Sequence, residues 1–126
     1  FVFNEGRINW YENITLVEGV FDHIVTPNSI PLLGKTLSMN DAAYIVLTTR
    51  AMANVNIMLD GDAYVDAVNV YKLLERSKLQ GRVNFIPMNN LPDGCKDASD
   101  VYQRYGAKGI VSILRSAYRL SEFDLL

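Results

Sequence analysis

The chain has 126 residues and a formal net charge of −2, with 49% apolar and 21% charged residues. This length suits one domain with a sizeable core, and the charge excludes a strongly basic protein that grips nucleic acid through bulk electrostatics. No apolar run is long enough to cross a membrane, and the single cysteine, Cys95, excludes an internal disulfide, which is typical of a reducing compartment. We therefore expect a cytoplasmic protein with no membrane partner.

Four short apolar runs predict strands. Residues 14–17 are rich in branched apolar side chains and too short for a helix, which is typical of a buried parallel strand. Residues 29–34 predict a weaker strand at an edge, because Pro31 lacks the N–H group that a strand ladder needs. Residues 55–59 and 83–87 repeat the buried pattern of the first run.

The segments between and after these runs carry helix signals. A capping-box spacing predicts a helix over residues 39–50, and an apolar stripe on one side predicts another over residues 62–78. Residues 97–105 predict a short helix that a glycine ends, and residues 110–117 predict a last amphipathic helix. Strands that alternate with helices predict one compact α/β domain, whose sheet of about four mainly parallel strands has helices on both faces.

Acidic residues follow three of the predicted strands. Glu18 comes directly after the first, with Asp22 four residues later; Asp60 and Asp62 follow residues 55–59, and Asp97 follows the loop after the last strand. Carboxyl ends of neighbouring parallel strands form one edge, where open sheets bind ligands, so we expect these acids to converge. Two carboxylates about 4 Å apart repel by roughly 4 kcal/mol at an effective dielectric of about 20. Raised pKa values or a bound cation must offset that cost.

Oxygen ligands without histidine or cysteine favour Mg²⁺, Mn²⁺ or Ca²⁺ over zinc. Two such ions would stabilise both the attacking and the leaving oxygen of a phosphoryl transfer. A local interpretation stays open, because Asp62, Asp97 and Asp100 also suit helix N-termini. Lys35 and Lys96 are candidates for phosphate contacts, and each is also typical of a solvated lysine in a loop or turn.

Three motifs in this order resemble the Toprim domain: "LVEGVFD" at residues 16–22, "LDGDA" at 59–63 and "LPDGCKD" at 91–97. This domain occurs in bacterial-type and phage DNA primases, topoisomerases of types IA and II, OLD-family nucleases and recombination-mediator proteins. The motifs are most similar to those of the primases, particularly the phage primases. The resemblance spans residues 15–105 and implies a compact, Rossmann-like Toprim fold, with residues 1–126 forming a single catalytic domain that we expect to be a fragment of a larger primase.

The resemblance also implies an activity, namely metal-dependent nucleotidyl transfer that makes RNA primers from nucleoside triphosphates on a single-stranded DNA template. It implies catalytic roles for Glu18, Asp60 and Asp62, and it implies that these three, with Asp22 and Asp97, hold Mg²⁺ or Mn²⁺. A replicative helicase or further primase domains are the partners that it suggests. The expected location is then the bacterial host cytoplasm if a phage encodes the chain.

Two departures from the family pattern bear on the site. Primases commonly have Ala-Gly after the second motif's two aspartates, whereas here Ala63 is followed by Tyr64 and Val65. In the third motif Cys95 is inserted, so that either Ser99 or Asp100 matches its final acid. Asp100 is therefore a candidate extra acid. Two alternatives to the primase remain: a Toprim nuclease that cleaves phosphodiesters with the same acids, and a non-catalytic Toprim module that serves protein contacts.

Overall fold

The computed structural model describes residues 7–32, 53–60, 63–89 and 91–120 of the chain. Its centre is a four-stranded sheet with the strand order β2-β1-β3-β4, and every pairing is parallel. The strands are β1 (Ile14–Val17), β2 (Ser29–Pro31), β3 (Val55–Met58) and β4 (Val83–Phe85). The predicted α/β fold with a parallel sheet of about four strands is confirmed.

The position of β2 at an edge of the sheet follows from its proline. Pro31 pairs with Val17 of β1 and cannot donate a ladder hydrogen bond. β1 and β3 occupy the centre, and all residues of both strands are buried. These two strands are therefore the rigid part of the sheet from which a site can be built.

Four α-helices are present in the described ranges: α1 (Val20–Val25), α3 (Tyr64–Glu75), α4 (Ala98–Tyr105) and α5 (Ala107–Arg115). A short 3-10 turn, η3 (Pro92–Gly94), lies in the loop before α4. The helices predicted over residues 62–78, 97–105 and 110–117 are thus found with shifted bounds, whereas the one predicted over residues 39–50 lies outside the described residues. None of the helices in the described part of the chain has the length and apolar character needed to cross a membrane.

The end of α3 comes earlier than the sequence predicts, at Glu75 rather than near Lys78. Ser77 is the cause, because its hydroxyl donates to the carbonyl of Leu74 and accepts the N–H of Leu79 at 3.1 Å. A serine that bonds to nearby main chain in this way competes with the helix for the same groups.

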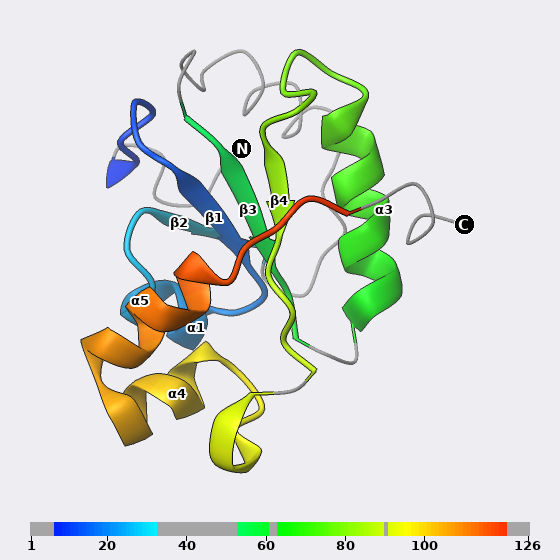
Figure 1. The fold of residues 1–126 in the computed structure, drawn as a ribbon. Helices are drawn as coiled ribbons and strands as arrows, with labels where there is room; N and C mark the ends of the chain where they lie inside the picture. The colour runs from blue at the N-terminus through cyan, green and yellow to red at the C-terminus, as the bar shows by residue number, and fades with distance from the viewer. Residues whose placement is uncertain (1–6, 33–52, 61–62, 90, 121–126) are drawn as a thin grey trace.

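The sheet is covered on both faces (Figure 1). Side chains alternate along each strand, so that Leu16 and Ile57 contact α3 and its neighbours while Val17 and Met58 face the side that carries α4 and α5. The first core also contains Val70, Tyr71 and Leu74 of α3, and the second contains Val101, Ile110 and Ile113. Full burial of a side chain of this size contributes about 1.5–3 kcal/mol, so the two cores fix the sheet between its helical layers.

After α5 the chain returns to the sheet. Tyr118 forms an isolated antiparallel bridge with Phe85 of β4, with N–H···O distances of 2.7 and 3.0 Å in the two directions. This bridge brings the end of the described chain to the carboxyl end of β4.

Candidate functional site

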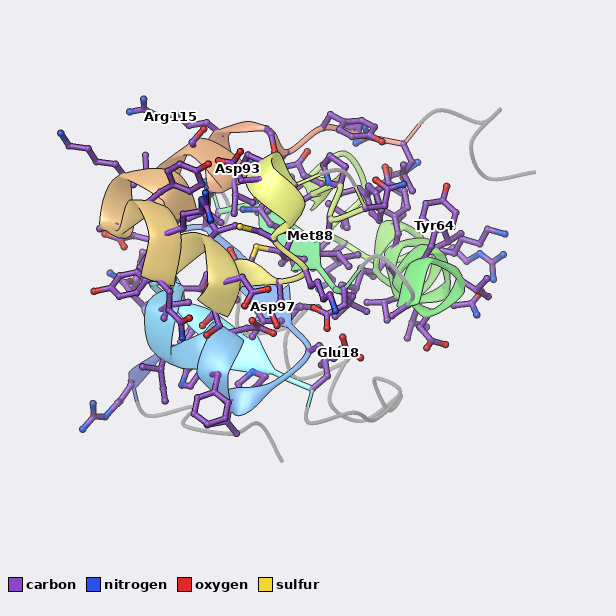
Figure 2. The ribbon with its side chains drawn as sticks, turned by 90° about the horizontal axis from the view of Figure 1, so that it is seen from below. Glu18, Tyr64, Met88, Asp93, Asp97 and Arg115 are labelled. Carbon is purple, nitrogen blue, oxygen red and sulfur yellow. The ribbon has the colours of Figure 1, made fainter. Side chains whose placement is uncertain are left out.

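Glu18 and Asp60 leave the sheet at the same edge. The register of β1 and β3 aligns Val17 with Met58, and Glu18 follows the first of these directly while Asp60 comes two residues after the second. Figure 2 looks at this edge, which is formed by the carboxyl ends of the strands. The central pairing of β1 with β3 therefore brings together two of the acids that the sequence proposes for catalysis.

The two side chains share a hydrogen bond, and their environment disfavours a second negative charge. Burial, the hydrogen bond with Glu18 and the charge of Glu18 raise the pKa of Asp60 to about 8, and the charges of Asp22 and Asp97 add to this effect. At neutral pH, without a cation, the Glu18–Asp60 pair therefore shares one proton. This proton removes one of the two negative charges, and so relieves the repulsion that the sequence predicts for clustered acids.

One oxygen of Glu18 has an unusual position. Oε2 is buried, and apart from the proton shared with Asp60 no group in the described part of the chain donates a hydrogen bond to it. A buried polar atom left without a partner costs about 1–3 kcal/mol, and more when the group is charged. A divalent cation that prefers oxygen ligands would satisfy this atom.

Asp22 and Asp97 flank the start of α4. Oδ1 of Asp22, which is buried on α1, accepts the N–H of Ser99 at 3.2 Å, and Asp97 caps the helix by accepting the N–H of Asp100 at 2.8 Å. Burial raises the pKa of Asp22, as do the charges of Asp97 and Glu18, while the N–H of Ser99 opposes the shift. Figure 2 labels Glu18 and Asp97 in the view of this edge, and the charges of both act on Asp60. The helix N-terminus stabilises negative charge, so it helps to hold these two acids beside the Glu18–Asp60 pair.

Asp100 and Lys96 are joined by a local contact. Oδ2 of Asp100 accepts the main-chain N–H of Lys96 at 2.9 Å. Together with the cap made by Asp97, this is the structural role that the sequence leaves open for Asp100. Lys96 is exposed, and its phosphate contact stays a prediction. Lys35 and Asp62 lie outside the described residues, so their predicted roles stay predictions too.

The described acids fit a divalent cation in part. Among residues 7–32, 53–60, 63–89 and 91–120, no three acidic, histidine or cysteine side chains are close enough together to hold one ion. The predicted set includes Asp62, which the structure does not describe. What the described part contributes is the hydrogen-bonded Glu18–Asp60 pair, the buried Oε2 without a partner and an all-carboxylate donor set, and each of these suits Mg²⁺ or Mn²⁺.

A pocket of about 340 Å³ adjoins the acidic pair, because Asp60 is one of its lining residues. Three aromatic rings form part of its wall. The ring of Phe85 lies 5.6 Å from that of Tyr64 and 6.0 Å from that of Tyr118, and both contacts are edge-on, at 86° and 82°. The other lining residues are Leu59, Ala67, Pro87, Met88 and Asn89. No sequence motif predicts this pocket, and Tyr64 stands out in the sequence only as a departure from the family pattern.

Comparison with known proteins identifies solved structures of similar fold. No protein-family model matches the chain, and no curated protein matches it. Among solved structures, the RNA polymerase domain of Mycobacterium tuberculosis primase DnaG superposes with a TM-score of 0.67 at 20% identity, covering 90% of this chain and 38% of that one. The Aquifex aeolicus primase, solved with its zinc-binding and RNA polymerase domains, gives a TM-score of 0.60 at 26% identity, covering 86% of this chain and 26% of that one.

The chain thus spans less than two fifths of the length of either solved primase chain. Over most of its own length it shares their α/β architecture, with an all-parallel four-stranded sheet between helices.

Proposed function

We propose that this chain is the Toprim catalytic domain of a phage-type DNA primase, which joins ribonucleotides into primers on single-stranded DNA. Its fold is similar to that of two solved primase structures, and this similarity supports a nucleotidyltransferase as the general kind of enzyme. The observation that carries the proposal is the Glu18–Asp60 pair at the edge between β1 and β3, where a buried oxygen of Glu18 has no donor in the described chain beyond the proton shared with Asp60.

In this proposal Glu18, Asp60 and Asp62 hold Mg²⁺ or Mn²⁺, and Asp22 and Asp97 contribute negative charge beside them. When bound, the ions would neutralise the charge that develops on the transferred phosphoryl group and on the leaving pyrophosphate.

The chain's own residues prepare the site for such a ligand. Asp60 would hold a cation as a carboxylate, so its proton would be released to solvent when the ion binds. Asp22 and Asp97 are each held near the pair by a main-chain N–H group of α4, at 3.2 and 2.8 Å. Their charge strengthens the attraction for a cation and also raises the pKa of Asp60 in its absence.

The partners follow from the activity. Nucleoside triphosphates and a single-stranded DNA template are the proposed substrates, a replicative helicase or further primase domains are the proposed protein partners, and the proposed location is the cytoplasm. With a net charge of −2, the chain has no excess of basic residues with which to hold a template. We therefore assign binding of the DNA template to basic groups outside this domain.

Primer synthesis tests the proposal. The longest natural protein that contains the chain is supplied with nucleoside triphosphates and single-stranded DNA, and ribonucleotide oligomers that require Mg²⁺ or Mn²⁺ are expected. Glu18→Gln should abolish them, whereas Asp66→Asn, which alters an exposed acid on α3, should not.

Two results would contradict this function. Cleavage of DNA without nucleoside triphosphates would identify the nuclease. Absence of Mg²⁺ and Mn²⁺ binding at millimolar concentration, with the natural function unchanged by Glu18→Gln, would identify a module for protein contacts.

A further inference from the structure

The pocket beside Asp60 lies where a nucleotide would extend away from the acidic pair. Asp60 contacts Glu18 on one side and lines the pocket on the other, so the two features share a border. The pocket is formed by the carboxyl end of β4, the start of α3 and the chain around Tyr118. Ligands of parallel sheets bind at this end of the strands, and the volume of about 340 Å³ falls within the range of small-molecule sites.

We propose that this pocket binds the nucleobase of a single nucleotide whose phosphates extend toward the cation proposed at Glu18 and Asp60. The orientation of the phosphates rests on the proposed function, whereas the affinity for a base does not. The base subsite consists of Tyr64, Phe85, Tyr118 and Asn89.

The aromatic rings supply the stacking surface. Phe85 is 6% exposed and forms the buried part of the wall, while Tyr64 and Tyr118 are each 44% exposed and leave part of their surface open. Both tyrosines are held edge-on against Phe85, and each such contact contributes about 0.5–1.5 kcal/mol. Rings that are already fixed lose little conformational entropy when a flat ligand binds, which favours affinity.

Asn89 supplies polar contacts at the exposed side of the pocket. Its amide offers two donor hydrogens and one acceptor oxygen, the combination that the edge of a base requires. Open aromatic surface beside an amide matches both parts of a base, its flat face and its edge of hydrogen-bond donors and acceptors. The departure at Tyr64 from the Ala-Gly of the family pattern thereby gains a role.

Binding of nucleosides without metal tests the pocket alone. Adenosine, guanosine, cytidine and uridine are titrated into the 126-residue chain, and amide shifts are followed by NMR, with changes expected at Tyr64 and Asn89. Base stacking on one aromatic side chain implies that Tyr64→Ala weakens binding roughly 5- to 150-fold, while Tyr64→Phe, which keeps the ring, stays within about twofold. The matched control is Tyr102→Ala, since Tyr102 is also 44% exposed but lies on α4 away from the pocket.

The inference is overturned if no nucleoside shifts the Tyr64 or Asn89 signals, or if Tyr64→Ala and Tyr102→Ala have equal effects. Tyr118→Ala provides a second variant, because its bridge to Phe85 uses main-chain atoms only and survives the substitution. It should weaken nucleoside binding in the same direction as Tyr64→Ala, and unchanged binding would contradict its place in the subsite.

A second pair of titrations separates this inference from the proposed function. With Mg²⁺ present, ATP is compared with inorganic triphosphate. Nucleoside binding without any gain from Mg²⁺ and triphosphate would support the base subsite and contradict the metal site. Equal affinity for ATP and inorganic triphosphate would support the metal site and contradict the base subsite. A tetranucleotide that binds while ATP and nucleosides do not would assign the pocket to a strand and refute the single-nucleotide proposal.

Discussion

The proton held between Glu18 and Asp60 makes the stability of the domain depend on pH, and Asp60→Asn should remove that dependence. In the folded chain the pKa of Asp60 is about 8, whereas an unfolded aspartate titrates at about 3.9. Between these two values the folded state binds one proton more than the unfolded state, so the free energy of unfolding falls as the pH rises. The stabilisation by the proton is complete below pH about 4 and lost above pH about 8.

The magnitude follows from linkage. One proton of difference gives at most about 1.4 kcal/mol per pH unit. Asp60 is only half-buried, so solvent screening discounts the total loss between pH 4 and pH 8 to about 2 kcal/mol, an average of about 0.5 kcal/mol per pH unit. Asparagine cannot ionise, and its amide can donate to Glu18 as the protonated aspartate does. Asp60→Asn should therefore flatten the slope and leave the variant about 1–2 kcal/mol more stable than the natural chain at pH 8.

The assay is urea unfolding at pH 5, 6, 7 and 8 in the presence of a chelator, for the natural chain, Asp60→Asn and the control Asp66→Asn. Asp66→Asn should keep the slope of the natural chain, because Asp66 is exposed on α3. If Asp60→Asn and the natural chain lose stability equally between pH 5 and 8, the retained proton is not at this pair and the reasoning is refuted.

Three further predictions concern the cation, the cap of α4 and the contact between α4 and α5. Adding Mg²⁺ at ten times its dissociation constant should stabilise the natural chain by about 1.4 kcal/mol in urea unfolding at pH 8, and Asp60→Asn by much less; equal gains would place the ion elsewhere. Asp97→Ala should lower the free energy of unfolding by about 1 kcal/mol, because it removes the cap of α4. Asp97→Asn should keep the cap but remove the charge, and so lower the pKa of Asp60; an unchanged pKa of the Asp60 carboxyl in an NMR titration would contradict this coupling. A Cβ at Gly109 would lie 2.7 Å from the Cβ of Tyr105, so Gly109→Ala should destabilise the chain by about 1–3 kcal/mol in thermal unfolding, while exposed Ser112→Ala on the same helix should not.

The sequence predicts the sheet well because its strands are buried on both faces. Residues 14–17 and 55–59 are apolar except for one residue each, Thr15 and Asn56, and Pro31 marks an edge, so both the strands and the position of the weakest one can be predicted from local composition. The convergence of Glu18 and Asp60 needs only the rule that ligands bind at the carboxyl ends of parallel strands.

Other parts of the site depend on contacts between distant segments. The hydrogen bond from Ser99 to Asp22 forms because α1 packs beside α4, and nothing in the sequence near either residue indicates it. The aromatic pocket likewise needs the chain after α5 to return and pair with β4 at Phe85. A single bridge is too short to give the alternation of apolar and polar residues that predicts a strand, so the local sequence does not predict the position of Tyr118.

That return of the chain, together with Pro31, also affects how the domain behaves at high concentration. Exposed strand edges are templates on which a second molecule can add its own strand, and this is a common start of aggregation. Within the described ranges, one outer strand of the sheet has three residues and ends in proline, and the other also has three residues and is engaged by Tyr118. Neither offers a long run of open main-chain groups, so molecules of this domain should have little tendency to join edge to edge into extended sheets.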